Sequence, residues 1–395
     1  MKHWIFVLML ICCAAKVSAQ KISGRVVDSV NNQPVPYASI SVLNSPLGTT
    51  SNAEGEFELS STWLPGNLVI SDLNHIRDTL RVIKNEFIQV RLQPTTIMLP
   101  GVAVTSFTGD LLKKAYRKLR SNNNVYWYST AFYRQVTRLD NQVTEIQEMV
   151  WDTKSNNSGL EGIALKQARY GEKKKALINF KDFPNFTRSV KIYSSAKDTS
   201  IITNVVGPNV DQFYNLKLIG FTQNGPREQV EIGFTTKSGA NTRNISGSVL
   251  LDNNTYQVLR FRVNTPDIHY GSNNPTFSFR NSTTAFEITF QPVSANESTL
   301  DFIRVSHQST LHRPLQSEIK IEVNSITTFY NGQAGPADVT YAPASENQLS
   351  LKTLKKTAYS AEFWRNNSAI KRTPTEEETI ASFEQSGIFG TMSKQ

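Results

Sequence analysis

Cysteine is nearly absent from this chain, whose 395 residues include only Cys12 and Cys13. Both lie within residues 1–19, where Lys2 precedes an apolar run that ends in small residues, the pattern of a secretory signal peptide. Removal of this segment would leave a chain without cysteine. Because secreted eukaryotic proteins of this size usually carry disulfides, the absence favours an exported bacterial protein of the periplasm or outer membrane.

Long hydrophobic runs are also missing. The apolar run over residues 4–15 is shorter than the about 20 residues that span a bilayer, and Lys16 ends it. We therefore expect no transmembrane span in the mature chain. Lipidation at Cys12 or Cys13 is the less favoured alternative, since a lipidated cysteine normally follows a small residue and Ile11 precedes Cys12.

Common catalytic motifs are missing too. The chain has no Gly-x-Ser-x-Gly elbow, no phosphate-binding Gly-rich loop and no His-x-x-Glu or His-Glu-x-x-His zinc motif. Its five histidines are scattered, and His307 and His312 would lie on opposite faces of a strand. The pair Glu145 and Glu148 resembles an exposed surface pair rather than the cleft pair of a glycosidase. We expect no enzymatic activity, no cofactor and no metal site.

Charge is sparse and unbalanced. Asp, Glu, Lys and Arg make up 19% of the chain, with a net charge of +9. Such an excess suits contact with nucleic acid or with anionic lipid headgroups. The exported address argues against nucleic acid. We interpret Lys173–Lys175 as a solvated run, with lipid headgroup contact as the alternative.

Short alternating strands dominate the N-terminal region. From Ile22 to Leu92, stretches of period two are separated by turns such as Asn52–Gly55, and no helical period interrupts them. This spacing predicts a small β-sandwich of about seven strands.

The same region resembles the carboxypeptidase regulatory-like domain. The resemblance rests on Gly24–Asp28, Pro34–Val42 and Gly48–Phe57; it departs from the family at Asn52, where Asp is usual, and at Asn74-His75, where a Gly-aromatic pair is usual. It implies an Ig-like β-sandwich of the kind that begins many envelope proteins and TonB-dependent receptors of Bacteroidota-type bacteria.

Residues 99–105 resemble the segment that joins this module to the plug of such a receptor. About 290 residues follow, whereas a plugged 22-stranded transmembrane barrel needs far more. The length therefore excludes a TonB-dependent receptor.

One helix and then many strands are predicted for the next region. Residues 111–120 carry apolar residues at helical spacing, opposite a basic face that we interpret as solvated, and Asp110 is the expected N-cap. Strands then continue to Tyr330, with a clear hairpin over residues 247–260 and an expected polar loop at Ser155–Lys175. The predicted fold is a large antiparallel β-domain with one early helix, for which a half-barrel is one possible form.

Two resemblances accompany this prediction. The order of elements is similar to the half-barrel of periplasmic lipoprotein carriers, in which a curved sheet encloses an apolar groove. Phe132-Tyr133-Arg134, Phe363-Trp364 and Lys371–Pro374 resemble motifs of uncharacterised Bacteroidota-type envelope proteins, which often have an acidic residue where Gln135 stands. The second resemblance implies no particular activity.

The C-terminal region is expected to form a short helical tail. Thr373 or Thr375 can cap a helix that begins with a run of glutamates. The apolar residues that would dock this helix are Ile380, Phe383 and Ile388. The predicted division of the chain is a signal peptide at 1–19, the sandwich at 20–94, a linker at 95–107, the antiparallel β-domain at 108–345 and the helical tail at 346–395.

An aromatic cluster is the most suggestive feature for ligand contact. Its members are Tyr126, Trp127, Tyr128, Phe132 and Tyr133. Alternation would place Tyr126, Tyr128 and Phe132 on one face of a strand and the other two on the opposite face. Core packing and a platform for an acyl chain or a sugar ring both remain open.

Two functions fit these observations. The first is a non-catalytic cell-envelope binding or assembly protein, in which the sandwich is a docking module and the β-domain binds a lipid or protein partner. The alternative is a secreted glycan-binding or glycan-processing protein. A continuous apolar groove would favour the first, and exposed aromatic residues beside a carboxylate pair would favour the second.

Overall fold

The structure is a computed structural model of the chain. It describes residues 21–98 apart from 44, 46 and 61, then 105–173, 177–193, 205–240, 242–268, 270, 275–344, 354, 357–366 and 369–389. The predicted signal peptide, with Cys12 and Cys13, lies outside the described residues. None of the described helices is long and apolar enough to cross a membrane.

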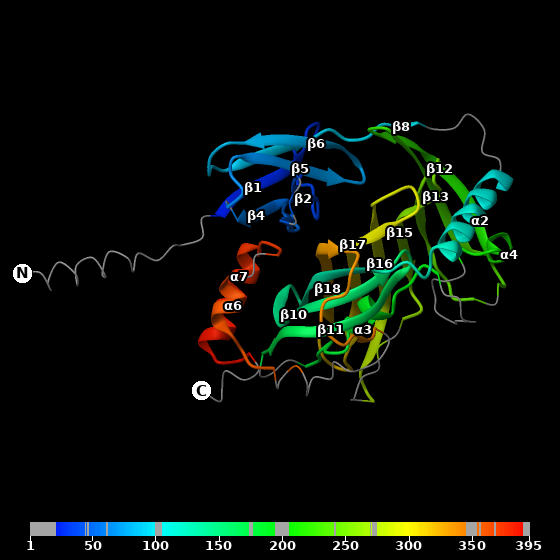
Figure 1. Cartoon of the computed structure of the whole chain (residues 1–395). Coiled ribbons are helices and arrows are strands. Elements are labelled where there is room, and N and C mark those ends of the chain that lie inside the picture. The colour runs from blue at the N-terminus through cyan, green and yellow to red at the C-terminus, as the bar shows by residue number, and fades with distance from the viewer. Residues whose placement is uncertain are drawn as a thin grey trace, which may run out of the picture.

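The N-terminal region forms a two-layered β-sandwich, as the alternating pattern predicts (Figure 1). One layer has the strand order β4-β1-β7 and the other β3-β2-β5-β6. The strands are β1 (Lys21–Asp28), β2 (Ser39–Val42), β3 (Gly48–Thr50), β4 (Glu56–Ser60), β5 (Gly66–Asp72), β6 (His75–Val82) and β7 (Ile88–Leu92). Their inward residues, such as Val26, Ile40 and Ile70, form one buried core.

Two glycines of the resembling motif are required by close packing. A Cβ at Gly24 would lie 2.4 Å from the ring of Phe57 and 2.5 Å from the carbonyl of Ile88. Gly55 has φ of +74°, a backbone conformation that residues with a side chain rarely adopt. A Cβ at this position would also clash with the carbonyl oxygen of Val26. Both positions therefore require glycine, which lets the Asn52–Gly55 turn lie directly against β1.

The second region is a twelve-stranded antiparallel sheet, which confirms the predicted class. Its order is β19-β11-β10-β9-β18-β17-β16-β15-β14-β13-β12-β8. The strands are β8 (Ile97–Met98), β9 (Trp127–Leu139), β10 (Gln142–Asn156), β11 (Gly159–Glu172), β12 (Tyr214–Asn224), β13 (Arg227–Thr236), β14 (Ser246–Asp252), β15 (Val258–Thr265), β16 (Ser278–Pro292), β17 (Ser298–His312), β18 (Ile319–Gln333) and β19 (Ala342–Pro343). After β11 the chain crosses to β12 and returns strand by strand until β18 pairs with β9.

The prediction of a polar loop at Ser155–Lys175 is wrong. Most of it is the strand β11, which pairs with β10 from Glu145–Glu172 to Asn156–Gly159. The polar and glycine-containing composition of this segment hid the strand, because its backbone is held by pairing with the long strand β10 rather than by its own alternation. The hairpin over residues 247–260 is confirmed as β14 and β15.

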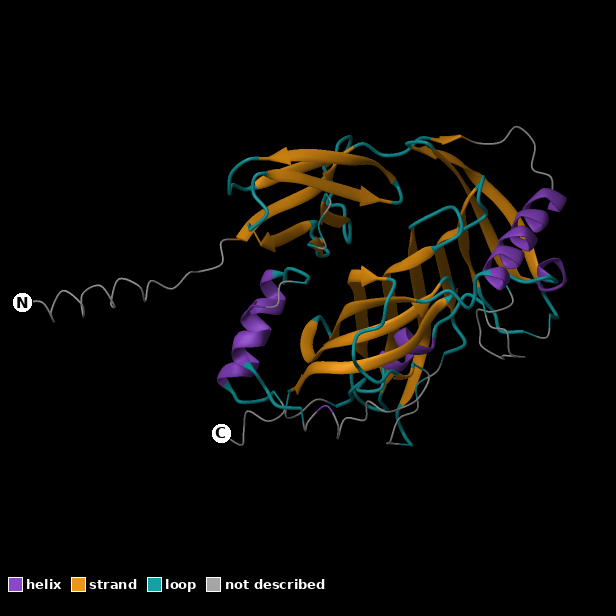
Figure 2. Ribbon diagram, in the orientation of Figure 1, coloured by secondary structure: helices purple, strands orange, loops and turns teal. Residues whose placement is uncertain are grey.

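The inner face of the sheet carries the main apolar core, which α2 (Thr105–Ser121) covers together with α3 (Pro184–Ser189) and α4 (Val210–Phe213) (Figure 2). Helix α2 begins before Asp110, so Asp110 lies within the helix and is not the predicted N-cap. Phe180 and Phe183 from the crossing segment pack into the same core. In the described residues, the chain's own side chains occupy much of the inner face where the resemblance to a half-barrel implied an apolar groove.

The C-terminal helices α6 (Ala361–Asn366) and α7 (Pro374–Gln385) pack on the outer face of the sheet, beside β9 and β10. Thr373 is the N-cap of α7 and forms a capping box with Glu376. Ile380 and Phe383 are buried and Ile388 packs beside them, which confirms the predicted docking.

Candidate functional site

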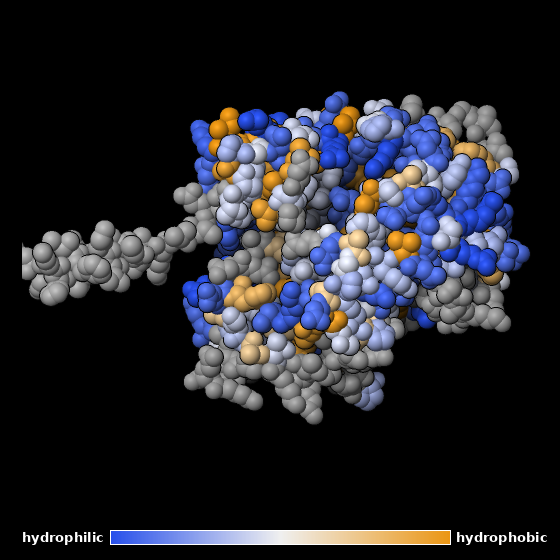
Figure 3. Space-filling view, in the orientation of Figure 1, coloured by the Kyte–Doolittle hydropathy of each residue, from blue (hydrophilic) through white to orange (hydrophobic). Residues whose placement is uncertain are grey.

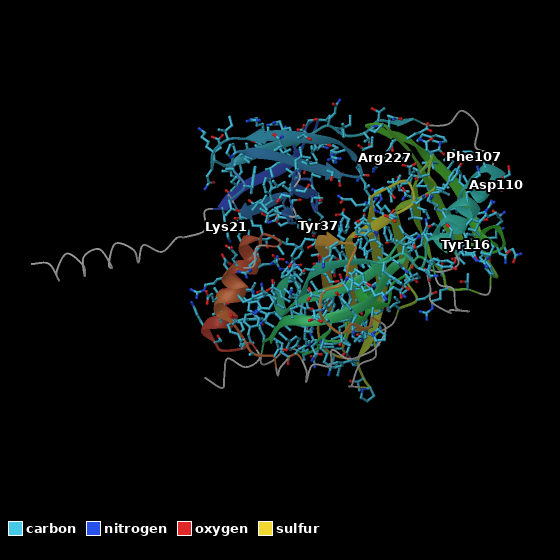
Figure 4. The ribbon with its side chains drawn as sticks, in the orientation of Figure 1. Lys21, Tyr37, Phe107, Asp110, Tyr116 and Arg227 are labelled. Atoms are coloured by element: carbon cyan, nitrogen blue, oxygen red, sulfur yellow. The ribbon has the colours of Figure 1, made fainter. Side chains whose placement is uncertain are left out.

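The sandwich docks on the outer face of the large sheet through an aromatic contact. Tyr37 of the sandwich lies between the two units (Figure 4). Its ring centroid is 6.3 Å from that of Phe302 and 4.1 Å from the guanidinium carbon of Arg304. Tyr37 has φ of +61°, which is unusual for an aromatic residue and is retained where surrounding structure fixes it.

Polar contacts complete the docking. Arg260 on β15 donates a hydrogen bond of 2.8 Å to the side chain of Asn74, and Asn224 on β12 donates one of 3.1 Å to the carbonyl of His75. Asn74 and His75 are the positions that depart from the resembling family, so this departure lies in the interface with the large sheet.

A crevice remains between the sandwich and the sheet. It consists of three cavities of about 350, 280 and 510 Å³, and Asp301 on β17 lines all of them. The first is lined by residues that include Ser41, Thr49, Trp127, Asp301, Phe329 and Tyr330. The second includes Tyr37, Asp72, His75, Arg260, Asp301 and Arg304, and the third includes Ser41, Asp72, Arg77, Phe290, Gln291 and Asp301. We call this space the crevice.

Arginines of β15 and β17 line the crevice in two ion-paired groups. Arg260 pairs with Glu231 at 3.0 Å, and Glu287 lies 2.8 Å from Arg262 and 3.5 Å from Arg304. Within the described part of the chain, the buried Nε atoms of Arg260 and Arg304 have no hydrogen-bond partner. Buried donors are normally satisfied, so these two atoms are available to a water or a ligand.

Two carboxylates from different units share the crevice. Burial and, to a smaller extent, the charge of Asp72 raise the pKa of half-buried Asp301 to about 7. Asp72 itself lies 2.6 Å from Nδ1 of His75, whose Nε2 is 3.3 Å from Asp28. Burial lowers the pKa of His75, but Asp72 and Asp28 together raise it above its ordinary value.

The five aromatic residues predicted for ligand contact are separated by the structure. Trp127 lines the first cavity of the crevice, and its buried indole nitrogen has no hydrogen-bond partner within the described residues. Tyr126 lies under Lys154, and Tyr128 packs against Tyr341 at 5.5 Å. Phe132 and Tyr133 are buried in separate core clusters on opposite faces, as the alternation predicts for this pair. Ligand contact by this cluster stays a prediction.

The expectation that Glu145 and Glu148 are surface residues is wrong, since both are fully buried on opposite faces of β10. Glu148 lies between Arg134 at 2.7 Å and Arg169 at 2.5 Å. Burial raises the pKa of Glu148, but the two arginines lower it to about 2. The carboxylate is therefore a structural ion-pair partner.

This ion-pair cluster joins the motifs that resemble envelope proteins. Arg134 donates to the carbonyls of Ile370 and Lys371, at 3.2 and 3.5 Å, and Arg169 stacks on Trp364 at 4.6 Å. The Phe-Tyr-Arg strand and the two C-terminal motifs thus form one contact. It holds the C-terminal segment where Ile370 pairs with Thr50 at the edge of the sandwich.

Sequence reasoning missed Asp72, Asp301, Arg260 and Arg304. The signal that could have indicated them is polar alternation along predicted strands, since Arg260 and Arg304 alternate with buried apolar residues. Such alternation marks a face that points away from the core. It does not show that the sandwich covers this face.

Comparisons with solved structures show only distant likenesses. A DUF1329 family protein from Desulfovibrio piger is 12% identical, with 59% of this chain and 95% of that chain covered at a TM-score of 0.24. A protein from Bacteroides fragilis, described as membrane-associated and of unknown function, is 9% identical. The match covers 79% of this chain and 97% of that chain, with a TM-score of 0.16. Lipovitellin is 12% identical; the match covers 55% of this chain and 26% of that chain, with a TM-score of 0.23. TM-scores this low carry no argument about fold or function.

Comparison by sequence is informative for the first unit. No curated protein matches the chain. Residues 22–104 match the model of the family described as CarboxypepD_reg-like domain. The match covers the whole sandwich and the segment that leads to α2, and it confirms the resemblance that the strand motifs indicate.

Proposed function

We propose that this chain is a non-catalytic binding protein of the cell envelope, and that it binds a glycan in the crevice between the sandwich and the large sheet. The observation that carries the proposal is the crevice itself, to which both units contribute walls. Binding sites occur preferentially at such interfaces, and pockets of about 300–1,000 Å³ are typical of them.

The chemistry of the walls favours a glycan. Trp127, Phe329 and Tyr330 contribute rings to the first cavity, next to the hydroxyls of Ser41 and Thr49. A sugar presents apolar ring faces and many hydroxyls, so a site with both aromatic and hydrogen-bonding groups suits it. An acyl chain would leave the polar groups of these walls desolvated and unpaired. The lipid and protein partners expected from sequence become alternative outcomes of the test.

A glycan-processing enzyme is the second candidate. Asp72 and Asp301 face one crevice, and the pKa of Asp301 is raised to about 7 by burial and by Asp72. Glycosidases use a carboxylic acid with a raised pKa beside an ionised carboxylate. Asp72, however, is already held by His75 at 2.6 Å. We therefore prefer binding without hydrolysis.

The proposal is tested with a glycan array, using the purified full chain. Ser41 lines two of the three cavities, so Ser41→Trp should fill the crevice and abolish the glycan signals. Ser23→Trp is the matched control because Ser23 lies on β1 of the sandwich and lines none of the three cavities. Thermal unfolding of each variant shows whether it folds.

The results separate the alternatives. Glycan signals that Ser41→Trp removes and Ser23→Trp retains support the proposal. Release of reducing sugar from a bound glycan, lost in Asp301→Asn, would establish the enzyme instead. Absence of any glycan signal, or signals that both folded tryptophan variants retain, would exclude glycan binding in the crevice; native mass spectrometry would then show whether a lipid is retained.

A further inference from the structure

The basic face of α2 is left largely without acidic partners. Of its basic residues, Lys113 pairs with Asp211 at 2.5 Å. Within the described residues, Lys114, Arg117 and Lys118 have no carboxylate oxygen within ion-pair distance. Figure 3 shows hydrophilic side chains over the part of the surface that α2 occupies. These three positive charges are therefore not neutralised by the fold.

The three basic residues line one shallow groove. The groove has a volume of about 610 Å³ and lies between α2 and two turns of the large sheet. Its other lining residues are Ser121, Asn254, Thr255, Tyr256, Ala295 and Asn296. None of the described residues that line the groove is acidic. We call this site the basic groove.

Side-chain contacts fix the cations at the walls. Lys114 donates a hydrogen bond of 3.2 Å to the hydroxyl of Tyr256, with its ammonium group 4.7 Å from the ring centroid. Lys118 donates one of 2.6 Å to the side-chain oxygen of Asn296. These neutral partners position the ammonium groups and leave their charges intact.

The two turns that form the opposite wall are rigidly joined. Buried Gln257 donates to the carbonyls of Ser294 and Glu297, at 3.0 and 3.1 Å. Asp252 accepts backbone hydrogen bonds from Asn254 and Thr255, at 2.9 and 2.8 Å, so its carboxylate is occupied within its own turn. The groove is thus formed before any ligand arrives.

We propose that the basic groove is a binding site for a phosphate group. A phosphate offers several acceptor oxygens, and Lys114, Arg117 and Lys118 offer charged donors without a competing carboxylate. Tyr256 and the asparagines of the turns add neutral donors around them. The phosphate can belong to a lipid headgroup or to a soluble phosphorylated compound. This site is distinct from the crevice and does not depend on the glycan proposal.

The test compares two triple variants of the full chain. Lys114→Gln, Arg117→Gln and Lys118→Gln remove the groove charges. Arg81→Gln, Lys84→Gln and Lys320→Gln remove the same number of exposed charges elsewhere, on the sandwich and on β18. Probes are vesicles of equal parts phosphatidylglycerol and phosphatidylcholine, vesicles of phosphatidylcholine alone, and inorganic pyrophosphate. Binding is measured by co-sedimentation and by calorimetry.

We expect the groove variant to bind about 100-fold more weakly than the parent and the control variant to change little, because each basic residue at an anionic surface contributes independently. Binding only to the anionic vesicles assigns the phosphate to a lipid, and binding to pyrophosphate assigns it to a soluble compound. Equal losses in both triples would reduce the effect to net charge and overturn the proposal. So would binding of neither probe by the parent protein, or full binding by a folded groove variant.

Discussion

Glu145 and Glu148 lie three positions apart on β10, and the fold moves their pKa values in opposite directions. Glu148 is ionised between two arginines. Glu145, on the inner face, accepts hydrogen bonds from Thr137 at 2.8 Å and from the amide of Phe180 at 2.9 Å, but no cation pairs with it in the described residues. Burial therefore raises the pKa of Glu145 to about 7. A buried glutamate is therefore stabilised as an ion-pair partner at position 148, whereas its ionised form is destabilising at position 145.

Glu145→Gln should change the pH dependence of stability. The folded-state pKa of Glu145 lies above the ordinary value of 4.5, so the folded protein loses stability as pH rises through about 7. Glutamine does not titrate, and the variant should gain about 2–3 kcal/mol relative to the parent between about pH 5 and about pH 8. Urea unfolding at both pH values measures this difference. A constant difference would contradict the prediction. Glu86→Gln, which replaces an exposed glutamate, is the matched control.

Helix α7 illustrates how local signals define an element. Thr373 precedes Pro374 and a run of glutamates, and its hydroxyl accepts from the amide of Glu376 at 3.4 Å while Glu376 accepts from the amide of Thr373 at 3.0 Å. These contacts involve neighbours in sequence, which explains why the helix start could be predicted. The choice between Thr373 and Thr375 depended on where the chain leaves the extended conformation.

Replacement of the cap should loosen α7. Thr373→Ala is expected to destabilise the helix by about 1 kcal/mol, because one orphan amide loses its acceptor. Hydrogen exchange of residues 376–385 should accelerate accordingly. Thr375→Ala is the matched control, since Thr375 lies one residue inside the helix and is not its cap. Equal acceleration in both variants would refute the capping assignment.

Besides the direct contacts between the sandwich and the sheet, the C-terminal segment contacts both units around Ile370. Ile370 pairs in parallel with Thr50 at the edge of the sandwich, and its side chain is buried against Phe132 on the large sheet and Trp364 on α6. Lys371 adds an ion pair of 3.1 Å with Glu56. The segment around Ile370 therefore connects the sandwich to the sheet on one side of the crevice.

Ile370→Ala should weaken the contact between the C-terminal segment and the sandwich without unfolding the large sheet. Truncation of a buried isoleucine costs about 2–5 kcal/mol, which here weakens the contact between units. Hydrogen exchange of Gly48–Thr50 should increase, while that of β14 and β15 stays unchanged. Ile380→Ala is the control because Ile380 packs between α7 and β10 and does not touch the sandwich edge. Protection of Gly48–Thr50 in the Ile370 variant equal to that of the parent would show that the segment is not the connection.

The sequence by itself determined the class of both units. Alternation and turn residues indicated the sandwich and the antiparallel sheet, apolar spacing indicated α2, and Thr373 indicated α7. Each of these signals depends on residues that are close in the chain, and the backbone responds to them locally. The strand at Gly159–Glu172 escaped because its neighbours, and not its own pattern, hold it in the sheet.

Tertiary structure alone decided which polar groups meet. Asp72 and Asp301 share a crevice because the sandwich docks on the outer face of the sheet, and Glu148 is buried because β9 and β11 place an arginine on each side of it. Burial and charge pairing depend on contacts between segments that are distant in the chain. The sequence around a carboxylate therefore does not show which groups will surround it in the folded protein.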